Sequence, residues 1–349
     1  RTISKFRKDN IEILKGLFKQ VVQICQKLGM VKLGLVAIDG TKIKAVASDY
    51  KAKTEVALQE ALKTIEEDIE KYLRDGITID EAEDILYGKD KSGFELPKEV
   101  IKNLEKKDAI KKAIEEIKDI KEVDKSKKKD PKINQVEKEA RFMKHSGGRI
   151  QLSYNCQVAV DEGGVIVGAE ITNEANDKKQ LVPMLKEVEE VTDKEPEKAI
   201  FDAGYHSRGN LEKIEGKETE CYVTSKKWEE EIKEEKAGNT DGDEVANVVS
   251  ASGDDINDGN EQANAGIINS DNKIKEVETE EVDVVEEMAK KVRSEEGREI
   301  YRKRKWIVEP VFGHIKYNLG FNRFRLKGIK KVRGEWLLTC LVYNIKKIH

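Results

Sequence analysis

Three acidic residues stand out because of the residues around them. Asp39 and Asp202 each end an apolar run and are closely followed by glycine, in AIDG and FDAG. Glu309 is a lone carboxylate inside a segment rich in lysine and arginine. Active-site groups of α/β sheets gather at the carboxyl ends of buried strands, so we expect Asp39 and Asp202 to lie together.

Carboxylates that converge from distant parts of a sheet can bind metal ions. Three of them can hold two divalent cations about 3.5–4 Å apart, the arrangement used for in-line displacement at phosphorus. Oxygen ligands favour Mg²⁺ or Mn²⁺. The sequence therefore predicts that Asp39, Asp202 and Glu309 are catalytic residues and metal ligands.

The segment around Glu309 has the charge expected of a nucleic-acid contact. Residues 301–349 hold 13 Lys and Arg residues and only 2 acidic ones, with aromatic residues between them. A carboxylate fits there if metal ions lie on it while the cations hold phosphates beside it. On a helix, Glu309, Gly313 and Lys316 share one face, although Pro310 should kink the helix or begin it. The predicted DNA contacts are Lys316, Arg302, Lys305, Arg323, Arg325 and Lys327.

Each of these residues also has a simpler interpretation. An Asp-Gly pair at a strand end is most often only a turn. His206 could be a general base, but we favour a surface-loop histidine. Asn176 and Asp177 are better explained as caps of the following helix than as ligands.

The elements that would position the acids can be outlined from periodicity. Residues 10–29 have the spacing of an amphipathic helix, and 33–47 that of a buried strand that turns at Asp39-Gly40 into a second strand. Residues 51–130 are helical in pattern, with one helix near 53–74, a turn at Gly76 and another helix from Pro97 to about 122.

The strand pattern returns from residue 150. A Gly-rich turn at 162–164 predicts a hairpin, and a helix then leads to the strand that ends at Asp202. Strand, helix and strand in succession predict a crossover onto the same sheet.

Residues 229–296 differ from the rest of the chain. They contain 22 acidic residues against 7 Lys and Arg residues, and 238–272 lacks hydrophobic periodicity. We expect this acidic insertion to be largely disordered. The net charge of −4 therefore conceals a basic C-terminal segment.

Composition limits the protein class. The four cysteines are scattered singly, which indicates a reducing cytoplasm and no zinc or disulfide framework. No apolar run reaches the roughly 20 residues of a membrane span. Because the sequence starts at Arg1, we expect a truncated N-terminal segment over 1–32.

Five stretches, in this order, resemble the DDE-type transposases of bacterial insertion sequences, whose catalytic core is ribonuclease H-like. They are AIDGTKIKA around Asp39, SYNCQVAVD at 153–161, the Asn-Asp pair at 176–177, FDAGYHS around Asp202, and VEPVFGHIKYNLGFNRFRLKG around Glu309.

One part of the family's third motif departs from the pattern. The family places an Arg four positions before the Glu and a Lys seven after it. Lys316 fits, but Arg304 lies five positions before Glu309, which on a continuous helix points it about 140° away. By helix geometry, Arg302 and Lys305 share the face of Glu309 instead.

The resemblance implies an α/β fold with a ribonuclease H-like mixed sheet flanked by helices, carrying a helical insertion and a disordered acidic insertion. The implied core comprises 33–50, 150–228 and 297–349, with the helical insertion at 51–130 and the acidic one at 229–296.

The implied activity is metal-dependent strand cleavage and strand transfer with two Mg²⁺ or Mn²⁺ ions. The implied partners are the element ends, the target DNA and a second copy of the chain in a synaptic complex. Two alternatives stay open: a DNA-binding remnant without catalysis, and a helical assembly protein that retains only the fold.

Overall fold

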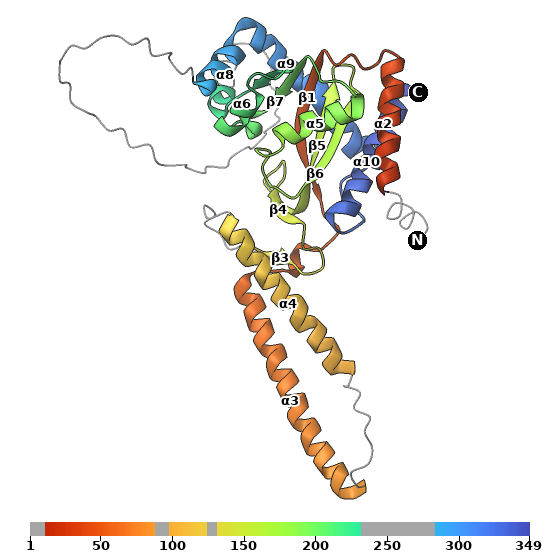
Figure 1. Ribbon diagram of the computed structural model, residues 1–349, viewed down its shortest axis with the longest axis vertical. Coiled ribbons are helices and arrows are strands. Elements are labelled where there is room, and N and C mark those ends of the chain that lie inside the picture. The colour runs from red at the N-terminus through yellow and green to blue at the C-terminus, as the bar shows by residue number, and fades with distance from the viewer. Residues whose placement is uncertain (1–10, 88–97, 124–130, 232–282) are drawn as a thin grey trace, which may run out of the picture.

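The computed structural model describes residues 11–87, 98–123, 131–231 and 283–349 (Figure 1). Within these ranges the chain forms a mixed sheet covered by helices, together with a helical hairpin that projects away from the sheet. The segment 238–272, expected to be disordered, lies outside the described residues.

A six-stranded sheet forms the centre of the fold, and β1 lies in its middle. β1 pairs antiparallel with β5 and parallel with β7, while β7 pairs parallel with β8. Both β4 and β6 pair antiparallel with β5. The strands are β1 (Leu35–Lys44), β4 (Arg141–Lys144), β5 (Ile150–Asp161), β6 (Ile166–Thr172), β7 (Lys198–Phe201) and β8 (Glu220–Val223).

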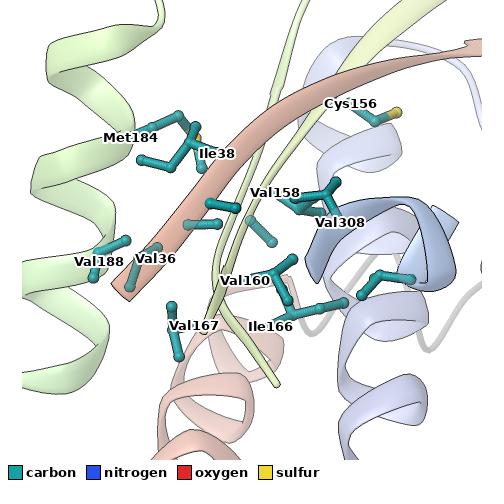
Figure 2. Packing of buried hydrophobic residues seen from close by; sticks show 14 of the residues in the cluster. Val36, Ile38, Cys156, Val158, Val160, Ile166, Val167, Met184, Val188 and Val308 are labelled. Atoms are coloured by element: carbon teal, nitrogen blue, oxygen red, sulfur yellow. The ribbon is translucent and has the colours of Figure 1, made fainter. Parts of the chain in front are cut away.

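Helices cover both faces of this sheet, so its central strands are apolar on both sides. Met184 and Val188 of α5 (Leu181–Thr192) pack on the face that carries Val36 and Ile38, as Figure 2 shows. Val308 of α9 lies on the other face. The helices of the core are α2 (Ile11–Lys27), α5, α6 (Arg208–Ile214), α8 (Val284–Arg293), α9 (Glu295–Gly313) and α10 (Ile329–Ile348). This arrangement confirms the predicted mixed α/β fold.

The helical insertion forms a hairpin of α3 (Glu55–Tyr87) and α4 (Lys98–Val123). Short strands β2 (Ala52–Lys53) and β3 (Ile133–Asn134) pair at its base. The hairpin has an apolar cluster of its own, separate from the main core. The turn predicted at Gly76 is wrong, because α3 continues through that residue.

Two further expectations need correction. β1 runs without interruption through Asp39-Gly40, so no turn forms there. Residues 284–293, assigned to the disordered acidic insertion, form α8, whose apolar side chains pack against the core.

The predicted hairpin at 162–164 is confirmed, because β5 and β6 pair across that turn. No helix in the described part of the chain is long and apolar enough to cross a membrane.

Candidate active site

Asp39 lies inside β1, and its carboxylate accepts two hydrogen bonds. Its Oδ1 accepts a hydrogen bond from the Gly40 backbone N–H at 2.7 Å, and its Oδ2 accepts one from Arg304 Nη1 at 2.8 Å. Asp39 stands opposite Val158 of β5, so its side chain is on the sheet face that α9 covers. Burial raises the pKa of Asp39, and the charge of Arg304 opposes that rise.

Asp202 comes directly after β7 and lies beside Asp39. Ile38 of β1 pairs with Phe201 of β7, so the two aspartates occupy the next position on adjacent parallel strands. The Asp202 carboxylate accepts a hydrogen bond from the Gly204 backbone N–H at 2.9 Å. Burial, followed by the charge of Asp39, raises the pKa of Asp202 to about 7. The register between β1 and β7 therefore places these two acids side by side, as predicted.

Arg304 lies at this site; it points away from Glu309, as expected, but its own face of α9, and not that of Glu309, packs on Asp39. Its buried guanidinium forms an ion pair with Asp39. Burial, the largest single effect, would lower the pKa of Arg304, but the charge of Asp39 and the smaller contributions of Tyr301, Asp202 and Glu229 together raise that pKa. The face of α9 that carries Tyr301, Arg304 and Val308 is the face that packs on the sheet, and Asp39 lies beneath it. The guanidinium Nε has no hydrogen-bond partner among the described residues.

Glu309 is on the same helix but outside this contact. It is exposed, and among the residues that the structure describes its side chain makes no hydrogen bond or ion pair. α9 passes through Pro310 to Gly313 and continues as a π-helical segment at His314–Asn318, so Pro310 does not begin the helix. The five-residue offset from Arg304 turns Glu309 away from the face that packs on Asp39.

The aspartate pair fits a divalent cation in charge and donor type. Two half-buried carboxylates lie near one buried guanidinium, which leaves an excess of negative charge that a cation would offset. Carboxylate oxygens are also the donors that Mg²⁺ and Mn²⁺ prefer. Across the described ranges, however, no group of three or more His, Cys, Asp or Glu side chains is arranged to hold a metal ion. Of the three predicted ligands, Asp39 and Asp202 therefore lie together, and Glu309 does not join them.

The predicted DNA contacts divide into three kinds. Lys316 is partly buried, burial lowers its pKa, and it interacts electrostatically with Asp39. Arg323 is already engaged, because its guanidinium donates to the backbone carbonyls of Ala45 and Val46. The other four predicted contacts are exposed: Arg302, Lys305, Arg325 and Lys327.

Asp177 is the residue that pattern reasoning placed wrongly. α5 begins at Leu181 and Asp177 does not cap it with its side chain. Instead its Oδ1 accepts hydrogen bonds from Asn155 Nδ2 and Gln157 Nε2, each at 2.6 Å. Lys42 Nζ lies 3.4 Å from its Oδ2. The signal for this cluster was the pair of amides inside the apolar strand around 153–161.

Glu229 also reaches the site from the segment assigned to the acidic insertion. Its carboxylate accepts a hydrogen bond from Tyr301 Oη at 2.5 Å, and its charge contributes to the raised pKa of Asp202. His206 follows the short 3₁₀ turn after Asp202, and burial lowers its pKa. Nothing in the sequence pattern separated Glu229 from the acidic residues that follow it.

Comparisons with known proteins identify the family of the chain. The chain matches the family model described as the Transposase DDE domain over residues 119–345, which includes Asp202 and Glu309 but not Asp39. No curated protein and no solved structure matches the chain significantly. Because the family match covers more than half of the 349 residues, the chain belongs to the transposase DDE domain family.

Proposed function

We propose that this transposase cuts DNA at the ends of an insertion sequence and joins the freed ends to target DNA in a metal-dependent reaction. The observation that supports this best is the pair of half-buried carboxylates, Asp39 and Asp202, on adjacent parallel strands next to the Arg304 guanidinium. Carboxylates at that position of a mixed sheet are suited to hold the cations of phosphoryl transfer.

The proposed ligands are Asp39, Asp202 and Glu309, holding two Mg²⁺ or Mn²⁺ ions. When bound, such ions activate the attacking oxygen and stabilise the leaving oxygen. Glu309 has to approach the aspartate pair, and its exposed position on α9 leaves its carboxylate unengaged. Arg304 orients Asp39, while Lys316, near Asp39, holds a phosphate of the bound strand.

The proposed partners are the element ends, the target DNA and a second copy of the chain. The exposed cations Arg302, Lys305, Arg325 and Lys327 supply the contacts to the DNA backbone. Four buried free cysteines suit a reducing compartment, so we place this activity in the bacterial cytoplasm.

One observation favours a second candidate, a DNA-binding protein whose catalysis has lapsed. Glu309 makes no contact with the aspartates, whereas Glu229 lies close enough to Asp202 to influence its pKa. If Glu309 does not complete the site, the chain would bind DNA without cutting it. The third reading, an assembly protein, would bind neither DNA nor metal at this position.

The experiment compares the parental chain with Asp202→Asn, Glu309→Gln and Glu229→Gln. Each is tested for strand cleavage of DNA carrying the element's own ends, with Mg²⁺ or Mn²⁺ present. We expect Asp202→Asn and Glu309→Gln to abolish cleavage, while Glu229→Gln cleaves at a reduced rate. Parental cleavage by Glu309→Gln would refute its role, and loss only in Glu229→Gln would move the third ligand to that residue.

Binding isotherms on the same DNA distinguish effects on DNA affinity from effects on strand cleavage. Lys316→Ala should weaken binding for all sequences and lower the magnitude of the salt slope by about one unit, because one phosphate contact is lost. Glu309→Gln should bind metal-free DNA as well as the parental chain or better, since a negative charge near phosphate is removed. An unchanged salt slope for Lys316→Ala would remove that residue from the phosphate contacts.

A further inference from the structure

The cluster around Asp177 lies behind the aspartate pair, on the opposite face of the sheet. Gly40 pairs with Gln157, and Lys42 pairs with Asn155. Residues that pair directly across two strands share a face, and successive residues along a strand face opposite ways. Asn155 and Gln157 therefore point to the α5 side, while Asp39 points to the α9 side.

Asp177 contacts the backbone next to both candidate ligands. A side-chain carbon added at Gly40 would lie 2.7 Å from Asp177 Oδ1, so the carboxylate sits directly over the residue that follows Asp39. The same construction at Gly204 gives 3.2 Å to Asp177 Oδ2. Gly204 is the residue whose N–H binds the Asp202 carboxylate. One carboxylate thus touches the peptide segments that carry both aspartates.

Asp177 is held in place by specific hydrogen bonds in a largely buried position. Its side chain is only 13% exposed and accepts two amide hydrogen bonds at 2.6 Å. Gln157 is in turn fixed by the Tyr205 hydroxyl, which donates to its Oε1. Tyr205 itself is buried in the turn that follows Asp202. The chain of contacts therefore begins beside Asp39 and ends beside Asp202.

From this geometry we infer that Asp177 is a positioning residue, which fixes the separation of Asp39 and Asp202 from the far side of the sheet. It acts through Gly40, Gly204 and the two buried amides, and it does not touch substrate. The inference rests on the proposed function, because it concerns the affinity of the aspartate pair for a divalent cation. Removing a residue that holds a metal ligand in place, without itself binding the metal, commonly changes metal affinity by 10–100-fold.

The test is Mn²⁺ binding to the full chain without DNA, followed by the electron paramagnetic resonance signal of free Mn²⁺. We expect Asp177→Ala to weaken Mn²⁺ binding about tenfold or more. Asp177→Asn keeps an oxygen acceptor for both amides, so we expect it to lie between Asp177→Ala and the parental chain. This graded rescue is the result that a positioning role requires.

Two controls separate positioning from loss of charge and from loss of stability. Asp193→Asn removes a carboxylate at the other end of α5, at a left-handed position that Asn tolerates. Val188→Ala removes core packing from the same helix and lowers thermal stability. Neither should change the Mn²⁺ affinity by more than about twofold.

The outcomes distinguish this inference from the proposed function. If Asp202→Asn keeps the parental Mn²⁺ affinity, the proposed metal site is wrong. If Asp202→Asn loses binding while a folded Asp177→Ala keeps parental affinity, only the role of Asp177 is refuted. Should Asp177→Ala fail to fold by circular dichroism, Asp177→Asn decides: a loss of affinity that Val188→Ala lacks supports the inference, and parental affinity refutes it.

Discussion

The ion pair between Arg304 and Asp39 places a permanent cation where the predicted site needs positive charge. Asp39 and Asp202 are both largely buried; Arg304 forms an ion pair with Asp39, and its charge also acts on Asp202. Two neighbouring buried carboxylates without a counter-charge would favour protonation over ionisation. Arg304 therefore stabilises the ionised form of Asp39, the form in which a carboxylate binds a metal.

Removal of Arg304 should lower the free energy of unfolding more in the absence of metal than in its presence. Arg304→Ala leaves a buried carboxylate without its partner, so we expect the free energy of unfolding to fall by about 3–5 kcal/mol in metal-free buffer. Mn²⁺ should raise the stability of this variant more than that of the parental chain. Urea unfolding with and without Mn²⁺ measures both effects, and Asp39→Asn in the same background should restore part of the loss.

Glu187 gives a pH prediction away from the candidate site. It is a buried residue of α5 whose Oε2 lies 3.3 Å from Lys15, and whose Oε1 has no partner among the described residues. Burial raises the pKa of Glu187 to about 7, from an ordinary value of 4.5. The folded protein therefore holds this proton more tightly than the unfolded chain does, and stability falls as the pH rises from about 4.5 to 7.

The Glu187→Gln variant should flatten that dependence. A shift of this size corresponds to at most about 3 kcal/mol between pH 4.5 and pH 8. Urea unfolding at both pH values should show a smaller difference for Glu187→Gln than for the parental chain. The exposed Glu190→Gln, which also loses a contact to Lys15, serves as the control. Equal pH dependence in the parental chain and Glu187→Gln would contradict the buried-carboxyl explanation.

At the scale of elements, two glycines that look alike in sequence differ in surroundings. A side chain at Gly40 would collide with the Asp177 and Asn155 side chains, at 2.7 and 2.9 Å. At Gly313, at the end of α9, a side chain would meet none of the described residues within 4 Å. Gly40 is therefore the position at which the close packing requires a residue without a side chain.

Alanine at the two positions should have opposite effects. Gly40→Ala should destabilise the chain by about 1–3 kcal/mol, because β1 and the polar cluster over it must separate. Gly313→Ala should stabilise it by about 0.5–1 kcal/mol, because alanine loses less backbone entropy in a helix. Thermal and urea unfolding of both variants provide the comparison. A stabilising Gly40→Ala would show that the cluster around Asp177 tolerates displacement.

The elements that periodicity predicts well are those with one simple hydrophobic pattern. The helix at 11–27, the hairpin at 162–164 and the strand before Asp202 agree with the structure. Asp39-Gly40 was read as a turn because that dipeptide usually is one. Here the strand continues, since the glycine makes room for side chains from other elements, and no local pattern reveals contacts of that kind.

The site shows the same limit. Both aspartates could be predicted because strand ends carry functional groups, even though Asp39 proved to lie within its strand. The role of Asp177 depends on its hydrogen bonds to Asn155 and Gln157 of β5, and that of Arg304 on which face of α9 packs on the sheet. The spacing correctly placed Arg304 and Glu309 on different faces of α9, but it took the face of Glu309 as the face of the site and therefore left Arg304 out.

At the scale of the whole molecule, the helical hairpin is held together by an apolar cluster of its own, and we expect it to open independently of the core. Its cluster includes Leu58, Ile114 and Ile117 and is separate from the core beneath α5 and α9. Small clusters of this kind open at lower free energy than the global core.

Alanine substitutions in the two clusters should therefore affect amide exchange over different parts of the chain. Ile117→Ala should speed amide exchange in α3 and α4 and leave β5 protected, because the cavity lies in the hairpin. Val158→Ala, in β5, should lower protection throughout the sheet. Hydrogen exchange with mass spectrometry resolves the two patterns. Loss of β5 protection in Ile117→Ala would show that hairpin and core unfold together.

The position of β1 in the chain also affects how the protein is made. β1 ends at Lys44, but its neighbours β5 and β7 begin at Ile150 and Lys198. At 5–20 residues per second, roughly 8 to 30 s pass on the ribosome between completion of β1 and completion of β7. During that interval the nascent chain carries an apolar strand with two open edges, which can pair with a neighbouring nascent chain. The α3–α4 hairpin can form in the meantime from contacts within it. Residues 35–44 are therefore a segment of this transposase that chaperones recognising short apolar sequences can bind during synthesis.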